Sequence, residues 1–147
     1  FFNSVLRDKS MHEMGIGTMR SISSIITGVF FPVWMCRAYT VRDKYNIWYS
    51  KFSFVNKSGL RAEVLALDMT EEVPALEVPA YFFSGRHDLT VNRDLSVQYF
   101  EKLDCPEKGF YTFEHSAHSP MFEEPARILE IMTHDVLNRE TNLADKQ

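Results

Sequence analysis

Two short apolar runs separated by an amphipathic segment constrain the fold of this chain most. The first run, residues 79–85, begins with proline and ends with glycine, and the second, residues 109–114, ends before a polar loop. Residues 93–103 between them carry apolar side chains at helical spacing: Leu95, Tyr99, Phe100 and Leu103. A further helix is predicted over residues 125–137. The order strand, helix, strand, helix predicts a βαβ unit with two parallel strands and flanking helices.

The preceding part of the chain, residues 1–77, lacks such strand patterns. Its apolar positions recur at helical spacing in short stretches, for example at residues 44–49 and 60–67. Helices rich in aromatic and methionine side chains suit a cap over a cleft. We therefore predict a helical cap segment over residues 1–77 and the βαβα part of an α/β core over residues 78–147.

Composition and charge narrow the choice of partners. The 147 residues carry a net charge of -4, whereas a nucleic-acid-binding protein needs a basic face. The longest uncharged run, residues 21–36, contains Gly28 and Pro32 and is shorter than the roughly 20 apolar residues of a spanning helix. Two cysteines, Cys36 and Cys105, fit a reducing compartment. We expect a cytoplasmic location and neither a nucleic-acid nor a membrane partner.

Polar loops follow both predicted strands, at residues 86–90 and 115–120. The carboxyl ends of parallel strands meet at one edge of a sheet, where ligands of open α/β sheets bind. Asp88 and His118 can therefore meet there, because neighbouring strands lie about 4.8 Å apart. Such a pair activates a nucleophile, with histidine as general base and acid and aspartate holding the ring in one tautomer. We predict Asp88 and His118 as catalytic residues.

Other interpretations of these loops stay open at this point. Asp88 is also a typical turn residue before residues 90–92, and His118 is also explained as a loop histidine bound to backbone. His115 is the second candidate for the base. His87, Asp88, His115 and His118 together suggest a metal site, although their spacing matches no known zinc pattern. We expect no metal and no organic cofactor.

The nucleophile of such a site is absent from the sequence. No glycine is followed by another glycine four positions later, as the motif Gly-x-Ser-x-Gly requires. No His-Gly-Gly run is present to supply an oxyanion loop either. The chain alone is therefore expected to be inactive.

Three motifs make a family resemblance specific: LEVPAYFFSGRHD at residues 76–88, YFEKL at residues 99–103 and FEHSAHSPMFEEP at residues 113–125. They resemble the C-terminal third of an α/β-hydrolase, closest to the bacterial proline iminopeptidase-like members. MGIGTM at residues 14–19 and YTVRDK at residues 39–44 resemble the helical cap of the same group. The resemblance implies that Asp88 is the triad acid and His118 the triad base.

Details of the third motif raise further expectations. Ala117 stands where many members of the family have glycine, and His115 stands where asparagine or a small residue is expected. Glu123 and Glu124 are expected to begin the last helix, with Pro125 at an early helical position, because acids are favoured near the positive end of a helix.

The resemblance implies the C-terminal part of an α/β-hydrolase fold whose N-terminal core, with the triad serine, lies outside this sequence. The complete enzyme is expected to be a serine-type hydrolase that cleaves a small ester or peptide-like substrate, of the aminopeptidase or esterase type. The alternative is a non-catalytic, truncated hydrolase that acts as a binding or complementation module. Its exposed sheet edge would pair with a separate N-terminal half or with a second copy of the chain.

Overall fold

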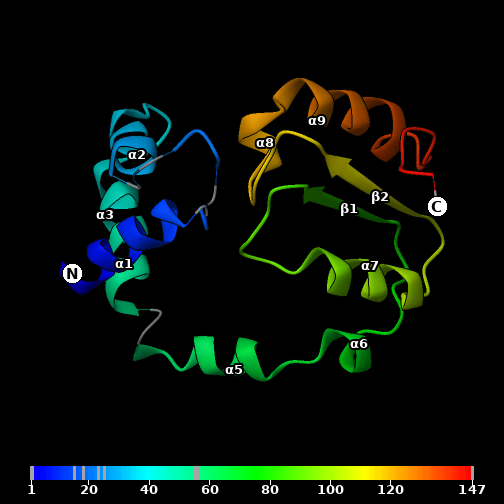
Figure 1. The fold of residues 1–147 in the computed structure, drawn as a ribbon, viewed down its shortest axis with the longest axis horizontal. Coiled ribbons are helices and arrows are strands. Elements are labelled where there is room, and N and C mark those ends of the chain that lie inside the picture. The colour runs from blue at the N-terminus through cyan, green and yellow to red at the C-terminus, as the bar shows by residue number, and fades with distance from the viewer. Residues whose placement is uncertain are drawn as a thin grey trace. The chain divides into compact units, whose positions relative to one another are not determined.

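The computed structural model describes residues 2–14, 16–17, 19–22, 24, 26–54 and 57–146. Gly15 and Thr18 of the 14–19 motif, and Ser23 and Ile25 of the long uncharged run, lie outside these residues. The described helices and strands (Figure 1) follow in this order: α1 Phe2–Glu13, η1 Ile26–Phe30, α2 Phe31–Met35, α3 Val41–Tyr49, η2 Ser50–Phe54, α5 Leu60–Ala66, α6 Met69–Glu72, β1 Ala80–Gly85, α7 Arg93–Lys102, β2 Lys108–Phe113, α8 Pro120–Glu123, α9 Pro125–Ile131 and η3 Met132–Val136, where η marks a π-helix. Within this described part, every helix is too short or too polar to cross a membrane.

The chain divides into two compact units. The first comprises Phe1–Met14 and Ile22–Leu67, and the second comprises Gly15–Ser21 and Asp68–Gln147. All described elements of the first unit are helical, and the second contains both strands. The division into a cap segment and a core segment after Glu77 stays a prediction about the complete fold.

In the first unit, local capping decides where helix α3 begins. Thr40 Oγ1 accepts a hydrogen bond of 3.2 Å from the Asp43 amide, and Asp43 Oδ2 accepts one of 2.9 Å from the Thr40 amide. This capping box satisfies two amide groups that a helix leaves without internal partners. The hydrogen bonds from Thr40 also lower the pKa of the Asp43 carboxyl. The helix therefore begins at Val41, earlier than the predicted start at residue 44.

In the second unit, β1 and β2 form a parallel pair, as predicted. The register runs from Ala80 opposite Lys108 to Gly85 opposite Phe113. The strands expected at residues 79–85 and 109–114 are found within one residue of those bounds. The described part of the chain is thus mixed α/β, with a two-stranded parallel sheet and flanking helices.

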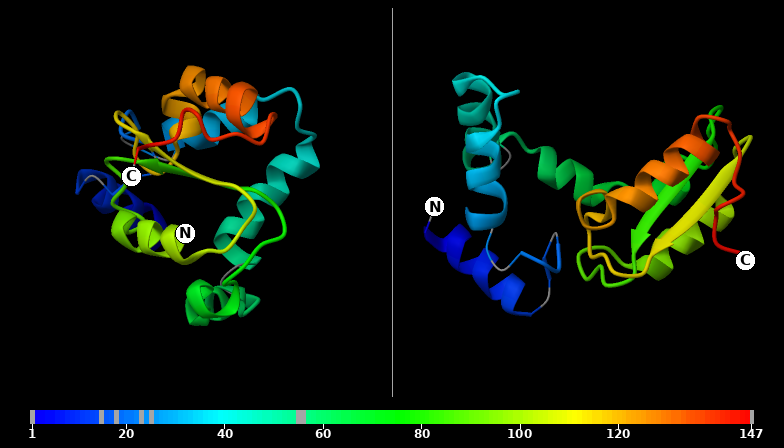
Figure 2. Two further views of the ribbon diagram at one scale, coloured as in Figure 1. Left: turned by 90° about the vertical axis from the view of Figure 1, so that its right-hand side faces the viewer. Right: turned by 90° about the horizontal axis from the view of Figure 1, so that it is seen from above.

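Successive side chains along each strand point to opposite faces of the sheet. Both faces carry apolar side chains, and each face packs against a helix. On one face, the ring of Phe82 lies 5.4 Å from that of Phe100 in α7. On the other, Tyr111 and Phe113 are completely buried and pack with Ile131 of α9. Figures 1 and 2 show α7 and α9 on opposite sides of the sheet. The core of this unit therefore lies in three layers, helix, sheet and helix.

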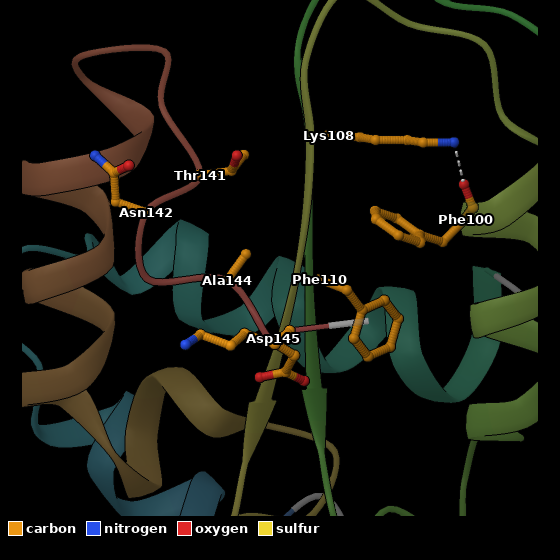
Figure 3. A pocket seen from close by; sticks show the side chains of 8 residues that line it. Phe100, Lys108, Phe110, Thr141, Asn142, Ala144 and Asp145 are labelled. Carbon is orange, nitrogen blue, oxygen red and sulfur yellow. Dashed lines mark hydrogen bonds between the residues drawn. The ribbon is translucent and has the colours of Figure 1, made fainter.

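The C-terminal segment covers the outer edge of β2. The Asp145 amide donates a hydrogen bond of 2.8 Å to the Phe110 carbonyl, and the Thr112 amide donates one of 3.0 Å to Asp145 Oδ2. The Thr112 hydroxyl donates to the same carboxylate oxygen. Figure 3 shows Asp145 beside the strand, where it lines a pocket of about 320 Å³ together with Lys108. Asp145 thus fills the place of a neighbouring strand at this edge.

A buried aspartate, Asp135, also holds the C-terminal segment in place. Asp135 is completely buried, and its Oδ2 accepts hydrogen bonds of 2.8 Å from the Tyr111 hydroxyl and from the Leu143 amide. Burial, together with this hydrogen bond to Asp135, raises the pKa of the Tyr111 phenol. Tyr111 therefore stays protonated and remains a donor to the carboxylate.

At the carboxyl end of the sheet, the two loops lie in direct contact. The His87 amide donates a hydrogen bond of 3.0 Å to the Ser116 carbonyl, and the Arg86 amide donates one of 2.9 Å to the Phe113 carbonyl. A Cβ atom at Gly85 would overlap the carbonyl oxygens of Ser116 and Ala117. Only glycine allows the end of β1 to approach the second loop so closely.

Replacing Asp145 should weaken the fold through the edge of β2. Asp145→Ala leaves the Thr112 amide and hydroxyl without their acceptor, and we expect it to lower the free energy of unfolding by about 1–3 kcal/mol. Asp145→Asn should cost less than half as much, because both hydrogen bonds from Thr112 end on one oxygen, which an amide can supply. Urea denaturation of the three proteins measures the difference. Equal losses for alanine and asparagine would contradict the role of that oxygen.

Replacing Gly85 should disturb the contact between the loops. We expect Gly85→Ala to lower the free energy of unfolding by roughly 1–3 kcal/mol, because the new methyl group needs space that backbone atoms occupy. Ala117→Gly should not rescue the variant, since the overlap involves carbonyl oxygens and not the Ala117 side chain. Thermal denaturation of the single and double variants tests both statements. A rescue by Ala117→Gly would show that the side chain causes the clash.

Candidate active site

Asp88 and His118 lie together at the carboxyl end of the sheet. Asp88 lies in the loop that follows β1 and His118 in the loop that follows β2. The distance between Asp88 Oδ2 and His118 Nδ1 is 2.8 Å. The Asp88 side chain is 10% exposed and that of His118 is 39% exposed. The carboxylate is thus largely withdrawn from solvent while the imidazole remains accessible.

The second carboxylate oxygen of Asp88 organises its own loop. Asp88 Oδ1 accepts hydrogen bonds of 2.7 Å from the Thr90 amide and 3.1 Å from the Val91 amide. Asp88 is therefore a turn residue and a partner of His118 at the same time. The turn fixes the direction of the carboxylate, because both of its oxygens have defined donors.

This geometry determines what the imidazole can do. With Nδ1 facing a carboxylate, the neutral ring is favoured as the tautomer that carries its proton on Nδ1. The Nε2 atom then keeps a lone pair and can accept a proton from a neighbouring hydroxyl group. A carboxylate in this position also stabilises the imidazolium that forms after proton transfer. The pair can therefore serve as a general base and, after protonation, as a general acid.

His115 contributes to the loop through its backbone. Its amide donates a hydrogen bond of 3.0 Å to Glu124 Oε1, and its carbonyl accepts one of 3.2 Å from the guanidinium of Arg20. Its side chain is exposed. It is the ring of His118 that contacts Asp88. The choice of His118 over His115 as the base stays a prediction.

Sequence reasoning missed how two acids hold the loop that carries His118. Ser116 donates to Glu124 Oε1 at 2.6 Å, and the Ala117 amide donates to Glu123 Oε2 at 2.7 Å. The expectation that both acids begin the last helix is met in part. Glu124 is the N-cap residue of α9 and Pro125 follows it in the first turn, as expected, although the Glu124 side chain makes no capping hydrogen bond. Glu123 instead ends α8.

A charged pair joins the outer parts of the two loops. The guanidinium of Arg86 donates through Nη2 to Glu114 Oε1 at 2.8 Å and through Nε to Glu114 Oε2. These hydrogen bonds raise the pKa of the Arg86 guanidinium and lower that of the Glu114 carboxyl. Both side chains are more than half exposed, so the pair adds little to stability. Its two parallel hydrogen bonds instead favour one relative orientation of the loops.

A small pocket of about 130 Å³ lies beside the pair of Asp88 and His118, and both residues line it. Arg93, which also lines it, donates a hydrogen bond of 3.1 Å to the Thr112 hydroxyl and lies over the ring of Phe110, 5.4 Å from its centre. Its Nε atom is buried without a hydrogen-bond partner in the structure. The pocket is therefore lined by both apolar and polar side chains, and Arg93 places a cation at its wall.

The metal-site interpretation finds no geometric support in the residues that the structure describes. Among them, His, Cys, Asp and Glu side chains form no group of three or more that could hold a metal ion. The Asp88 oxygens already face His118 and two backbone amides. The observed arrangement is a carboxylate paired with one imidazole.

Comparison with known proteins gives two bacterial relatives. Over 103 residues, or 67% of this chain, the sequence is 37% identical to the protein of Bacillus subtilis (strain 168) named "Probable aminopeptidase YbaC". Over 110 residues, or 73% of this chain, it is 29% identical to "Proline iminopeptidase" of Heyndrickxia coagulans. These matches cover 30% and 35% of the two relatives. The chain thus spans about a third of the length of the curated relatives it matches.

No protein-family model and no solved structure matches the chain. The two relatives nevertheless carry names typical of α/β-hydrolases, and one of them is named as a proline iminopeptidase. This agreement confirms the resemblance drawn from the sequence. The chain is a relative of the bacterial proline iminopeptidase-like α/β-hydrolases.

Proposed function

We propose that this chain supplies the acid and the base of a Ser-Asp-His triad in an α/β-hydrolase of the aminopeptidase or esterase type. The observation that carries the proposal is the 2.8 Å contact between Asp88 Oδ2 and His118 Nδ1 at the carboxyl end of two parallel strands. The names of both relatives, an aminopeptidase and a proline iminopeptidase, support a hydrolase that acts on peptide-like substrates.

In the proposed reaction, a serine from outside this sequence attacks the substrate carbonyl. His118 Nε2 takes the proton of the serine hydroxyl, and Asp88 holds the ring and stabilises the imidazolium. His118 then returns the proton to the leaving group, and the same steps with water release the acyl product. The backbone donors of the oxyanion hole also come from outside this sequence, since one of them directly follows the nucleophile.

The proposed substrate is a small ester or a peptide-like molecule. The segment proposed as the cap, residues 1–77, contains a group of aromatic rings. The ring of Phe30 lies 5.8 Å from that of Trp34 and 5.0 Å from that of Trp48. Aromatic and apolar side chains of this kind typically line pockets for small substrates. The proposal includes no metal ion and no organic cofactor.

A second candidate function is that of a binding module that completes a separate chain. The two edges of the sheet differ, because Asp145 covers the outer edge of β2. In the described part of the chain, β1 has only β2 as a strand neighbour. A strand edge with free backbone groups is a template for pairing with another strand. A separate N-terminal half of the same fold, or a second copy of the chain, is the proposed partner at β1.

The first test concerns the choice of histidine. In the full-length enzyme, His118→Ala should lower kcat by about 10⁴-fold or more, because the nucleophile loses its base. Asp88→Asn should lower kcat by a similar factor, since the amide favours the wrong tautomer of the ring. His115→Ala should stay within about threefold of the parent enzyme, as expected for an exposed side chain that makes no proton transfer. Steady-state hydrolysis of a nitrophenyl ester and of an aminoacyl amide measures all three, and the opposite pattern for the histidines would identify His115 as the base.

The second test uses the chain itself. Alone, it should show no esterase activity above background, because the nucleophile is absent. Mixed with a separately produced N-terminal half that contains Gly-x-Ser-x-Gly, it should form a complex on a sizing column and gain activity. The His118→Ala chain is the matched control, which should form the complex without gaining activity. Absence of both complex and activity would contradict pairing at β1, and a complex without activity for the parent chain would favour the non-catalytic module.

A further inference from the structure

One carboxylate connects the loop of His118 to a distant part of the chain. Glu123 Oε2 accepts a hydrogen bond of 2.7 Å from the Ala117 amide. Its other oxygen, Oε1, accepts one of 2.6 Å from the Arg20 amide. Arg20 returns to the same loop, where its guanidinium donates to the His115 carbonyl at 3.2 Å. All of these residues belong to the second unit.

The Glu123 carboxylate accepts its hydrogen bond from the amide of a buried residue. Ala117, which directly precedes His118, is only 2% exposed, so water cannot easily replace Glu123 as the acceptor for its amide. Hydrogen bonds from an amide to a charged acceptor are among the strongest in proteins. An amide left unsatisfied in such a position loses the solvation it would have in water. Glu123 therefore fixes the backbone immediately before His118.

We propose that Glu123 is a positioning residue for His118, because its carboxylate joins the Ala117 amide to the Arg20 amide and holds the imidazole against Asp88. The proposal rests on the proposed function only for its catalytic consequence. Its structural part concerns the orientation of the His118 ring. Arg20 thereby becomes part of the support of the site, although it precedes His118 by almost a hundred positions.

Glu124 offers an internal comparison. The His115 amide and the Ser116 hydroxyl both donate to a single oxygen of Glu124, Oε1. A glutamine can supply that oxygen and place its NH₂ group on the other side. At Glu123 each oxygen accepts a hydrogen bond from a different backbone amide, so a glutamine must point its NH₂ group at one of the two donors. The same substitution should therefore be tolerated at Glu124 and harmful at Glu123.

The experiment follows His118 by NMR in the isotope-labelled chain, without any substrate. In Glu123→Gln, we expect hydrogen exchange of the Ala117 amide to become about tenfold faster. The ratio of the Nδ1-protonated to the Nε2-protonated form of the His118 ring should fall by about threefold or more, because the contact with Asp88 is held less firmly. Glu124→Gln should change both quantities by less than about twofold. Glu130→Gln, at an exposed position of α9, is the matched control for loss of one negative charge.

The following NMR results would overturn the proposal that Glu123 positions His118. Equal responses of the Glu123→Gln and Glu130→Gln variants would overturn the proposal, and so would an unchanged ring tautomer in Glu123→Gln. If Glu123→Gln does not fold, the parent chain decides: the Ala117 amide must exchange at least about tenfold more slowly than in an unstructured peptide, and equal rates would overturn the proposal. Since the NMR signals do not depend on turnover, they test the positioning by Glu123 separately from catalysis by His118.

In the full-length enzyme, the same variants test the catalytic consequence. Glu123→Gln should lower kcat by about tenfold or more while KM changes by less than about twofold, since a misplaced base affects proton transfer more than substrate binding. Glu124→Gln should retain most of the parent kcat. A normal kcat in Glu123→Gln would overturn the catalytic part of the proposal. Full activity of His118→Ala would instead reject the proposed function and leave the NMR result on Glu123 standing.

Discussion

The parallel register of β1 and β2 is the constraint on which the site depends. Because Gly85 lies opposite Phe113, both strands end at the same level of the sheet and their loops begin side by side. The close approach at Gly85 and the hydrogen bond from His87 to Ser116 then bind the loops together. Asp88 and His118, far apart in the sequence, meet without a long or flexible connection. The entropy of bringing them together is lost when the sheet forms, and not at the site itself.

Two interpretations of Asp88 that compete at the level of sequence turn out to be compatible. A turn aspartate and a partner of histidine would exclude each other if one carboxylate oxygen had to serve both. In the structure, Oδ1 binds the turn amides and Oδ2 faces His118. The turn thus holds the carboxylate in one orientation, and the imidazole receives a preorganised partner. Local loop geometry and the geometry of the site depend on the same side chain.

The sequence predicted the features that local runs and spacings of apolar residues define. The strands follow from short apolar runs and helix α7 from apolar residues at helical spacing. The parallel pairing and the meeting of the loops at one sheet edge follow from the order of these elements. The contacts made by Glu123, Glu124 and Asp145 could not be predicted in this way. Their partners are mainly backbone amides, which every residue except proline carries, so no residue type in the sequence marks them. For Glu123 and Glu124, the local pattern pointed instead to a helix start.

The contacts of Asp88, His118 and Glu123 determine which catalytic contributions this chain makes to the proposed enzyme and which must come from outside it. A positioned imidazole and carboxylate move protons, which typically accelerates a reaction by 10²–10⁴-fold. Stabilising the developing oxyanion needs backbone donors in a dry site, and this contribution is usually larger. Under the proposed function, Asp88 and His118 of this chain therefore transfer protons, and Glu123 holds His118 in position. The nucleophile and the oxyanion donors must then come from strands that add at β1, because Asp145 already occupies the other edge of the sheet.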